Sequence, residues 1–158
     1  MSGKVHSVNV SSGGVPKTMV ESAEIRKGGV EGDFNRFRDG RGGDLDRAVC
    51  IFSLERIEGL KQEGHPIEVG STGENLTIRG VEWDSLSEGD RLEVGDAVLE
   101  LSEPCAPCSK IGESFIGRRF ARVDHEEEYG WSRWLARVVR EGRVSVGDSV
   151  NMVITPDR

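Results

Sequence analysis

The sequence predicts a mainly β protein with some α structure, in the form of a β-barrel-like domain with two or three packed helices. Three observations favour this class. Short segments of alternating apolar and polar residues recur, helical patterns are few, and 21 of the 158 residues are glycine, where about 11 would be usual. Only five residues are proline, so the glycines indicate tight turns in a folded chain. The length is that of one ordinary domain, and residues 1–158 are expected to form a single domain.

Turns are marked by the dipeptide Gly-Asp, which occurs five times. Glycine adopts a positive φ without strain and aspartate hydrogen-bonds to nearby backbone, so the pair is typical of tight turns. Two of these turns, at residues 95–96 and 147–148, separate alternating segments and predict β-hairpins. The others lie at residues 32–33, 43–44 and 89–90.

The first 45 residues show little hydrophobic periodicity and are expected to form irregular loops, which are often functional. The glycine-rich turn Ser11–Lys17 ends in a lysine, and its backbone N–H groups could form an anion-binding nest. Its spacing is not that of a Walker loop. Arginines surround a second glycine-rich stretch at residues 40–43, and some could hold a phosphate through two hydrogen bonds. They are Arg36, Arg38, Arg41 and Arg47.

Several later segments predict strands. Residues 47–52 are almost continuously apolar, which is typical of a strand buried on both faces. Cys50 lies in the middle of this run and is expected to pack in the core as a small hydrophobic residue. Alternation predicts further strands at residues 76–79, 92–94, 97–101, 144–146 and 150–154.

A short helix is predicted directly after the first of these strands. Ser53 is a favourable N-cap, because its side chain can accept a hydrogen bond from a backbone N–H of the first turn. Leu54, Ile57 and Leu60 fall on one helix face, and Gly64 is a suitable end.

A second helix is predicted over Trp131–Arg140, where apolar residues recur with helical spacing and Gly142 follows as a stop. On this basis Trp131 and Trp134 are expected in the core. The acidic run at residues 126–128 is interpreted as the solvated first turn of this helix, where negative charge suits the helix dipole.

Charge and composition exclude several classes of partner. The formal net charge is −7, which argues against binding to nucleic acid or to anionic lipid, because both require a basic surface. No apolar run approaches the roughly 20 residues of a membrane span, and the first residues lack the apolar core of a secretory signal. Three cysteines do not make a disulfide framework. A cytoplasmic location is therefore expected.

The sharpest local feature is the Cys-Ala-Pro-Cys segment at residues 105–108, expected on a loop at a strand end. Four interpretations stay open on the residues alone: a thioredoxin-type dithiol, half of a structural zinc site, a single functional thiolate, or two small buried thiols. The first lacks a surrounding βαβ pattern, and the second lacks two further ligands at suitable spacing. Lys110 closely follows Cys108, and a nearby cation favours a thiolate, which is a soft metal ligand.

Several segments, in this order and spacing, resemble the MOSC domain family, which is named for the C-terminal domain of molybdenum-cofactor sulfurase. The resemblance extends over nearly the whole chain and implies a stand-alone domain of the bacterial type. The segments are GVEGD at residues 29–33, GGDLDRAV at 42–49, GENLT at 73–77 and PCSKI at 107–111, with weaker likeness at 12–17 and 142–148.

The resemblance implies a β-rich barrel that binds molybdenum cofactor or carries sulfur for it. Cys108 matches the family cysteine that is the proposed molybdenum ligand or persulfide carrier, which makes it the expected catalytic residue. Stand-alone bacterial relatives are linked to reduction of N-hydroxylated bases and amines, so the implied partners are a small-molecule substrate and an electron-transfer protein. A sulfur carrier would instead meet a cysteine desulfurase, and a non-enzymatic cofactor carrier is a further alternative.

Other residues are assigned to the cofactor by charge, placement and chemistry. Molybdopterin is an anionic, phosphate-bearing dithiolene, so Lys17, Arg47 and Lys110 are candidate phosphate or pterin partners. Asn75 can donate and accept, as a pterin edge requires. Cys105 is a possible resolving thiol that captures a persulfide as a disulfide.

Two expectations complete the assignment. The chain has Arg41 where relatives often have a histidine, so a proton relay there is not expected. The thiol of Cys108 is expected to face an open hollow lined by positive charge.

Overall fold

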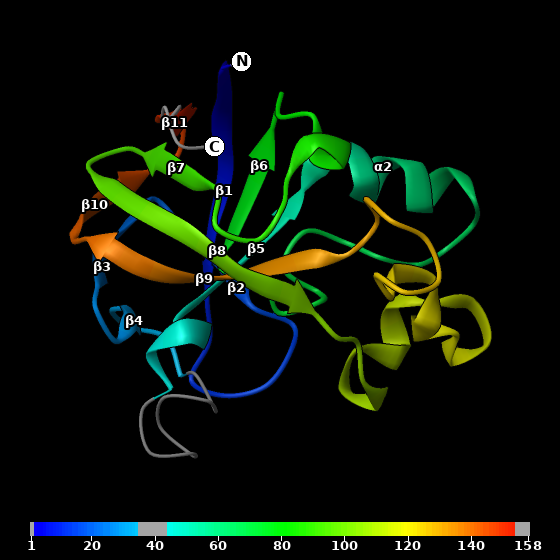
Figure 1. Ribbon diagram of the computed structural model, residues 1–158. Coiled ribbons are helices and arrows are strands. Elements are labelled where there is room, and N and C mark those ends of the chain that lie inside the picture. Colours follow the sequence, from blue (N-terminus) through cyan, green and yellow to red (C-terminus); the bar gives the residue numbers. More distant parts are fainter. Residues whose placement is uncertain (1, 35–43, 154–158) are drawn as a thin grey trace.

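The structure is a computed structural model that describes residues 2–34 and 44–153, and within these residues seven strands close into a barrel (Figure 1). The barrel strands are β1 (Ser2–Val10), β5 (Val49–Ser53), β6 (Leu76–Arg79), β7 (Arg91–Val94), β8 (Ala97–Cys105), β9 (Arg133–Arg140) and β11 (Ser149–Val153). Their spatial order is β11-β7-β8-β9-β5-β6-β1, and β1 pairs with β11 to complete the circle. The predicted mainly β, barrel-like class is confirmed.

Shorter elements surround the barrel. The strand β2 (Thr18–Val20) extends the sheet beyond β1. A separate antiparallel sheet has the order β10-β3-β4 and consists of β3 (Ser22–Arg26), β4 (Gly29–Val30) and β10 (Gly142–Ser145). Helical segments are α2 (Leu54–Gln62) and the 3-10 turns η1 (Leu45–Arg47), η2 (Trp83–Ser85), η3 (Ser109–Ser114), η4 (Ile116–Arg118) and η5 (Phe120–Val123).

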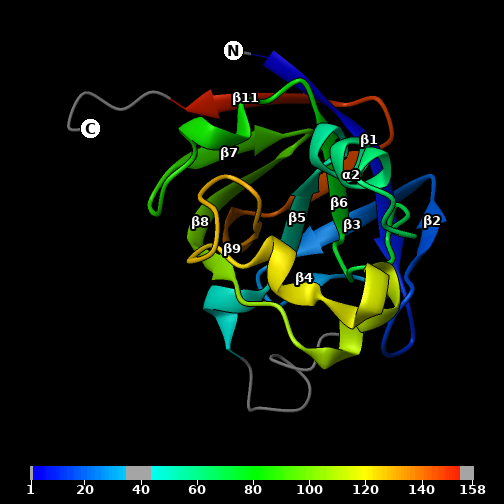
Figure 2. The same cartoon turned by 90° about the vertical axis from the view of Figure 1, so that its right-hand side faces the viewer.

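The helix α2 forms where the sequence predicts it. Ser53 Oγ accepts a hydrogen bond from the Arg56 backbone N at 3.2 Å, and Gly64 adopts φ +98° beyond the last turn. The helix connects β5 to the parallel strand β6 and buries Ile57 and Leu60. Figure 2 shows it in front of these strands. This β-α-β unit accounts for the parallel pair in an otherwise antiparallel barrel.

The hydrophobic core fills the barrel, and every barrel strand contributes to it. Representative side chains, all at most 1% exposed, are Val5, Ile51, Ile78, Leu92, Leu99, Ala136 and Val150. A barrel packed in this way is a rigid support for side chains and loops at its ends.

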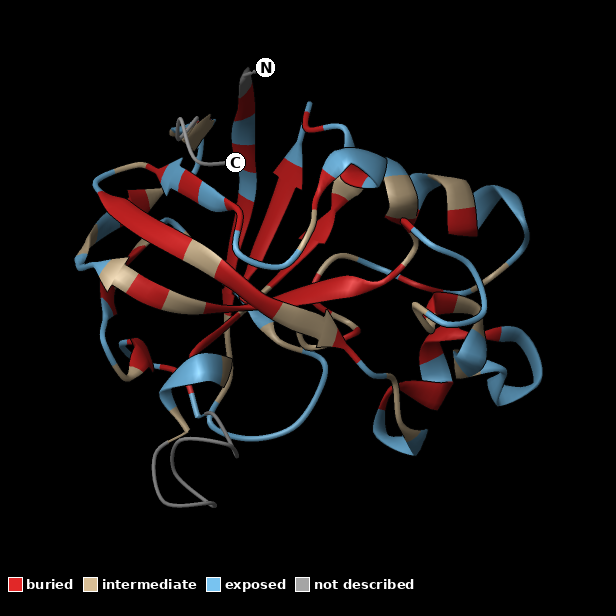
Figure 3. Cartoon of the chain, in the orientation of Figure 1, coloured by how far each residue is buried: buried red, intermediate tan, exposed pale blue. Residues whose placement is uncertain are grey.

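The predicted helix over residues 131–140 is wrong, because Arg133–Arg140 form the strand β9. This strand lies between β8 and β5, and its residues from Arg133 to Ala136 are all buried (Figure 3). A strand covered on both faces has a nearly continuous apolar run, which can also match helical spacing. Hydrogen-bonded pairing of β9 with β8 and β5 therefore decides its conformation, against the helical spacing of its apolar residues. The acidic run at residues 126–128 lies in a turn before β9 rather than in the first turn of a helix.

The two tryptophans of this region differ in their surroundings. Trp134 is 4% exposed and lies in the core, as predicted. Trp131 is partly buried against the core, with the guanidinium carbons of Arg56 and Arg122 lying 4.6 and 4.1 Å from its ring centre. Its ring is therefore occupied by protein cations.

Irregular structure for the first 45 residues is also contradicted, since β1 to β4 lie there. In β1 the polar side chains of Ser7 and Asn9 are buried, and the register shifts between Val5 and Ser7. Buried polar residues and a bulge hide the alternation by which a strand is recognised. The expectations for Arg36, Arg38 and Arg41 fall outside the described residues.

Among the described residues, none of the helices has the length and apolar character needed to cross a membrane.

Candidate functional site

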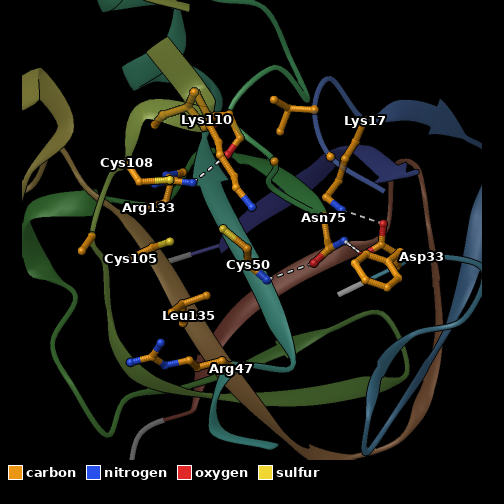
Figure 4. A pocket seen from close by; sticks show the side chains of 17 residues that line it. Lys17, Asp33, Arg47, Cys50, Asn75, Cys105, Cys108, Lys110, Arg133 and Leu135 are labelled. Carbon is orange, nitrogen blue, oxygen red and sulfur yellow. Dashed lines mark hydrogen bonds and ion pairs between the residues drawn. The ribbon is translucent and has the colours of Figure 1, made fainter. Parts of the chain in front are cut away.

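A cavity of about 190 Å³ lies beside β5, β8 and β9, on the face of these strands opposite the barrel core (Figure 4). Segments far apart in the sequence meet there: the loop after β1, the turn after β4, the turn before β6, the end of β8 with η3, and the start of β9. Its described lining residues include four cationic side chains, one carboxylate and three thiols. They are Lys17, Arg47, Lys110, Arg133, Asp33, Cys50, Cys105 and Cys108.

Strand pairing places the two inner cysteines on the cavity face. Cys105 ends β8 opposite Arg133 of β9, and Cys50 of β5 lies opposite Leu135. Paired residues on adjacent strands project to the same face, as do residues two apart on one strand. These four side chains therefore share the face that lines the cavity, as Figure 4 shows.

On the other side of the cavity, Lys17 and Asp33 form a buried ion pair. Lys17 Nζ lies 2.7 Å from Asp33 Oδ1, and the two side chains are 9% and 3% exposed. The Ser11 backbone N also donates to Asp33 Oδ1, at 2.9 Å. Lys17 is held in place by its backbone N, which donates to the Gly70 carbonyl at 2.9 Å. A Cβ on Gly70 would lie 2.5 Å from the Lys17 carbonyl oxygen, so this close approach requires glycine.

Asn75 connects this pair to β5. Its Nδ2 donates to Asp33 Oδ2 at 3.0 Å and to the Asn9 carbonyl at 3.3 Å, while its Oδ1 accepts from the Cys50 backbone N at 3.1 Å. Both amide hydrogens are therefore directed to protein acceptors, and Oδ1 is the atom with spare capacity for a ligand. The side chain orders the cavity wall.

Arg133 is a buried cation without a carboxylate partner in the described part of the chain. It is 5% exposed, its Nη1 donates to the Thr72 carbonyl at 2.6 Å, and its Nε is buried without a hydrogen-bond acceptor. Burial lowers the pKa of Arg133, but the nearby Cys105, Cys50 and Glu74 raise it more, so the net shift is upward. A permanent positive charge therefore lies in the cavity wall, and one of its N–H groups has no hydrogen-bond acceptor.

The two inner cysteines have opposite protonation behaviour. A hydrogen bond from the Cys50 thiol, helped by the charges of Arg133 and Arg47, lowers the pKa of Cys105 to about 6 against the effect of burial. The same interaction, together with burial, holds the pKa of Cys50 well above its ordinary value. At neutral pH Cys105 is mainly a thiolate and Cys50 a thiol. The expectation that Cys50 is a plain core residue is wrong, because it is only partly buried and lines the cavity.

The lowered pKa of Cys105 predicts a pH-dependent contribution to stability. Its ordinary pKa is 9.0, so the folded state favours the thiolate, and the stabilisation is lost as pH falls through about 6. At pH 7 the contribution is on the order of 1 kcal/mol. The free energy of unfolding should therefore fall more between pH 7 and pH 5 in the native chain than in Cys105→Ala. Urea titrations at both pH values test this, and equal losses in the two chains would contradict it.

All six residues assigned from the sequence line this one cavity. Cys108 is half-buried and precedes η3, and Lys110 is exposed within η3. Arg47 Nε lies 2.6 Å from Glu103 Oε1, so its charge is shared with a carboxylate. The expectation that Cys108 lies beside a positively lined hollow is confirmed; the roles assigned to the six residues stay predictions.

Two residues of the site are absent from the sequence-based assignment. Arg133 is overlooked because the apolar spacing of its segment predicts a helix. A helix at this place would not bring Arg133 beside Cys105 on a neighbouring strand. Cys50 is overlooked because an apolar run does not tell which face of the strand borders a cavity. The sequence carries no signal for Arg133, because its burial beside the cavity depends on the pairing of β9 with β8.

The structural-zinc interpretation of residues 105–108 is not supported. A structural zinc ion takes four protein ligands. Within residues 2–34 and 44–153, no three His, Cys, Asp or Glu side chains are grouped so that they could hold a metal ion. A single half-buried thiol, that of Cys108, suits a metal whose remaining ligands come from elsewhere.

Comparisons with known proteins agree with the fold and the motifs. Residues 15–151 match the family described as MOSC domain. The chain is 29% identical to the uncharacterized protein YflK of Bacillus subtilis over 142 residues, covering 89% of this chain and 63% of that protein. It is 31% identical over 133 residues to a protein of Gibberella moniliformis named reductase, covering 81% of this chain and 23% of that protein.

The chain thus spans about three fifths of the length of one relative and about a quarter of the other. The crystal structure of the YuaD protein from Bacillus subtilis superposes with a TM-score of 0.76 at 20% identity, covering 96% of both chains. At this identity the likeness shows a shared fold.

Proposed function

The chain belongs to the MOSC domain family, and on that premise we propose that its cavity binds molybdenum cofactor with Cys108 as a thiolate ligand of molybdenum. The loaded protein would reduce N-hydroxylated bases or amines. MOSC domains are associated with molybdenum cofactor. The single observation that supports the proposal most is the position of Cys108 at a cavity lined by four cationic side chains.

The cavity fits an anionic, sulfur-bearing guest. Positive lining charges outnumber negative ones, and the Arg133 Nε–H lies buried without an acceptor. Its volume of about 190 Å³ exceeds the roughly 150 Å³ of an apolar cavity that holds a benzene ring. One ring system or one metal centre with its nearest atoms fits inside, and the rest of a cofactor would extend to the rim.

Each residue has a separate task in this proposal. When bound, the cofactor supplies the electron and oxygen-atom chemistry. Cys108 holds the metal by its thiolate, while Lys110 and Arg47 at the rim attract phosphate or pterin oxygens. Lys17 is oriented by Asp33 and keeps that wall of the cavity ordered.

Reduction of an N–OH group to N–H consumes two electrons and two protons and releases water. The proposed partners are therefore a small-molecule substrate and a separate electron-transfer protein. The small cavity and its apolar lining, which includes Val15, Phe34, Ile111 and Leu135, favour a compact substrate with a flat or apolar part.

Metal loading tests the ligand assignment. Protein purified from molybdate-supplied cells is expected to carry about one molybdenum per chain and a fluorescent pterin after oxidation, because a thiolate is a soft ligand for such a centre. Cys108→Ser should lose nearly all of the molybdenum. Elemental analysis and pterin fluorescence measure both quantities, and cells unable to make the cofactor give the baseline.

Cys50→Ser is the matched control, since it changes another partly buried thiol of the same cavity. It should keep most of its metal. Equal molybdenum in native protein and Cys108→Ser would overturn the ligand assignment, and absence of molybdenum and pterin from the native protein would overturn the proposed cofactor.

A sulfur-carrier function is the alternative, favoured by the presence of three thiols in one cavity. Cys108 would then hold a persulfide received from a cysteine desulfurase. Mass spectrometry after incubation with such an enzyme should show one added sulfur on Cys108. A loaded protein that reduces no substrate would instead support a cofactor carrier.

A further inference from the structure

Cys105 lies beside a buried cation and a second thiol, and neither metal binding by Cys108 nor packing of the apolar core accounts for them. It is 9% exposed, borders the cavity and lies opposite Arg133 across one strand pairing. Cys50 reaches the same cavity from β5, on the other side of β9. A cation and a second thiol thus converge on one sulfur.

Arg133 supplies an independent reason to expect an anion here. In the described residues its side chain forms no ion pair with a carboxylate, and its Nε is buried without an acceptor. An isolated buried charge costs several kcal/mol, so such a group is normally paired. The sulfur of Cys105, opposite Arg133, is placed to carry balancing charge, together with the buried carboxylate of Glu74. Of the other charged groups near Cys105, Arg47 favours its thiolate and Glu103 opposes it.

We propose that Cys105 is a second nucleophilic site of the cavity, separate from Cys108, with Arg133 as its counter-ion, and that it takes the outer sulfur of a small persulfide. The lowered pKa of Cys105 agrees with this role. The nucleophilic site stands without any bound cofactor, while its use in sulfur transfer rests on the sulfur-carrier alternative above.

The transfer step is balanced without an added oxidant or reductant. The Cys105 thiolate attacks the outer sulfur of a persulfide RS–SH, and a new S–S bond forms at Cys105. The old S–S bond breaks, its electron pair leaves with RS⁻, and the proton stays on the transferred sulfur. The persulfide ionises readily, and the positive charge of Arg133, opposite Cys105, favours its anionic form.

Cys50 serves Cys105 as a hydrogen-bond donor and not as a disulfide partner. Their strands lie on either side of β9 and their positions are offset by two residues, so their backbones are at least two strand spacings, roughly 9–10 Å, apart. A disulfide needs Cα atoms within about 7 Å. Cys50 therefore keeps its proton and leaves the Cys105 sulfur free to react with a third molecule.

Alkylation of the Cys108→Ser variant tests the nucleophilic site directly. Iodoacetamide is applied between pH 5 and pH 9.5, and peptide mass spectrometry follows the labelling of Cys105 and Cys50 separately. Cys105 labelling should reach half of its maximal rate near pH 6 and should exceed Cys50 labelling at pH 7 by 10-fold or more. A half-point above pH 8, or faster labelling of Cys50, would overturn the assignment.

Two variants test whether Arg133 and Cys50 make Cys105 reactive at neutral pH. Arg133→Met and Cys50→Ala, each in the Cys108→Ser background, should move the half-point upward and slow Cys105 labelling at pH 7 by about 10-fold, while labelling at pH 9.5 persists. Arg137→Met is the matched control, because it removes a charge from the same strand at a side chain outside the cavity. An unchanged half-point in Cys50→Ala would refute the hydrogen-bond role even where Arg133→Met does not fold.

Sulfur transfer is then measured with a small persulfide, glutathione persulfide, on the same Cys108→Ser protein. One added sulfur should appear on Cys105 and should decline in the Cys50→Ala variant at pH 7. Normal alkylation of Cys105 without added sulfur would overturn the persulfide substrate. Because this protein needs no molybdenum, failure here is distinguishable from failure of the metal-loading experiment.

Discussion

Asp33→Ala is expected to lower the free energy of unfolding by about 3–5 kcal/mol, because it leaves the charge of Lys17 buried and unpaired. Lys17 Nζ lies 2.7 Å from Asp33 Oδ1, and both side chains are less than 10% exposed. The substitution also removes the acceptor of the Ser11 backbone N and of Asn75 Nδ2. Urea unfolding followed by circular dichroism gives the free energy.

Glu31→Ala is the control for this experiment. Glu31 Oε2 lies 3.2 Å from Arg26 Nε, but both side chains are more than half exposed, so this pair should contribute less than about 1 kcal/mol. The double variant Lys17→Met/Asp33→Ala should be more stable than the sum of the single losses predicts. A loss of less than 1 kcal/mol in Asp33→Ala would show that Lys17 finds another partner or water.

Glu74→Ala should have an effect of similar size, about 3–5 kcal/mol, because three buried donors lose their acceptor. The side chain is fully buried, Oε1 accepts from Thr72 Oγ1 at 2.8 Å, and Oε2 accepts from the Gly70 N and from Thr77 Oγ1, each at 3.0 Å. For a chain of this length the melting temperature should fall by roughly 10 °C or more. Differential scanning calorimetry measures the shift.

Glu93→Ala is its matched control on the exposed side of β7, where substitutions usually change stability by no more than about 0.5 kcal/mol. Glu74→Gln should recover part of the loss, since it keeps an acceptor oxygen. Similar melting temperatures for Glu74→Ala and Glu93→Ala would mean that the turn before β6 orders itself without this carboxylate.

These two carboxylates explain why the family motifs are visible in the sequence. Asp33 and Glu74 lie in conspicuous glycine-containing segments, and each organises a turn that borders the cavity. A buried carboxylate beside a glycine turn is visible in the sequence as a short motif, because the acidic residue and the glycine stand at a fixed spacing. The candidate site could therefore be assembled from short segments before their positions in space were known.

Other features depend on partners distant in the sequence and leave no such signature. β9 has the apolar spacing of a helix, and only pairing with β8 and β5 decides its conformation. The accessibility of Cys50 depends on which face of β5 meets the cavity. The polar side chains of Ser7 and Asn9 are buried on the face of β1 opposite the core residue Val8, where Asn9 Nδ2 donates to Thr77 Oγ1 at 3.1 Å. In each case long-range packing outweighs local preference.

The closure of the barrel by β1 and β11 also determines how the domain can be joined to other chains. Ser2 pairs with Asn151, so both ends of the described chain lie side by side. The opposite end of β1 leads into the loop that lines the cavity. At about 3.3 Å per residue, that strand separates the two regions by roughly 25–30 Å. A chain joined beyond Ser2 or Val153 would therefore start at the end of β1 that is remote from the cavity loop.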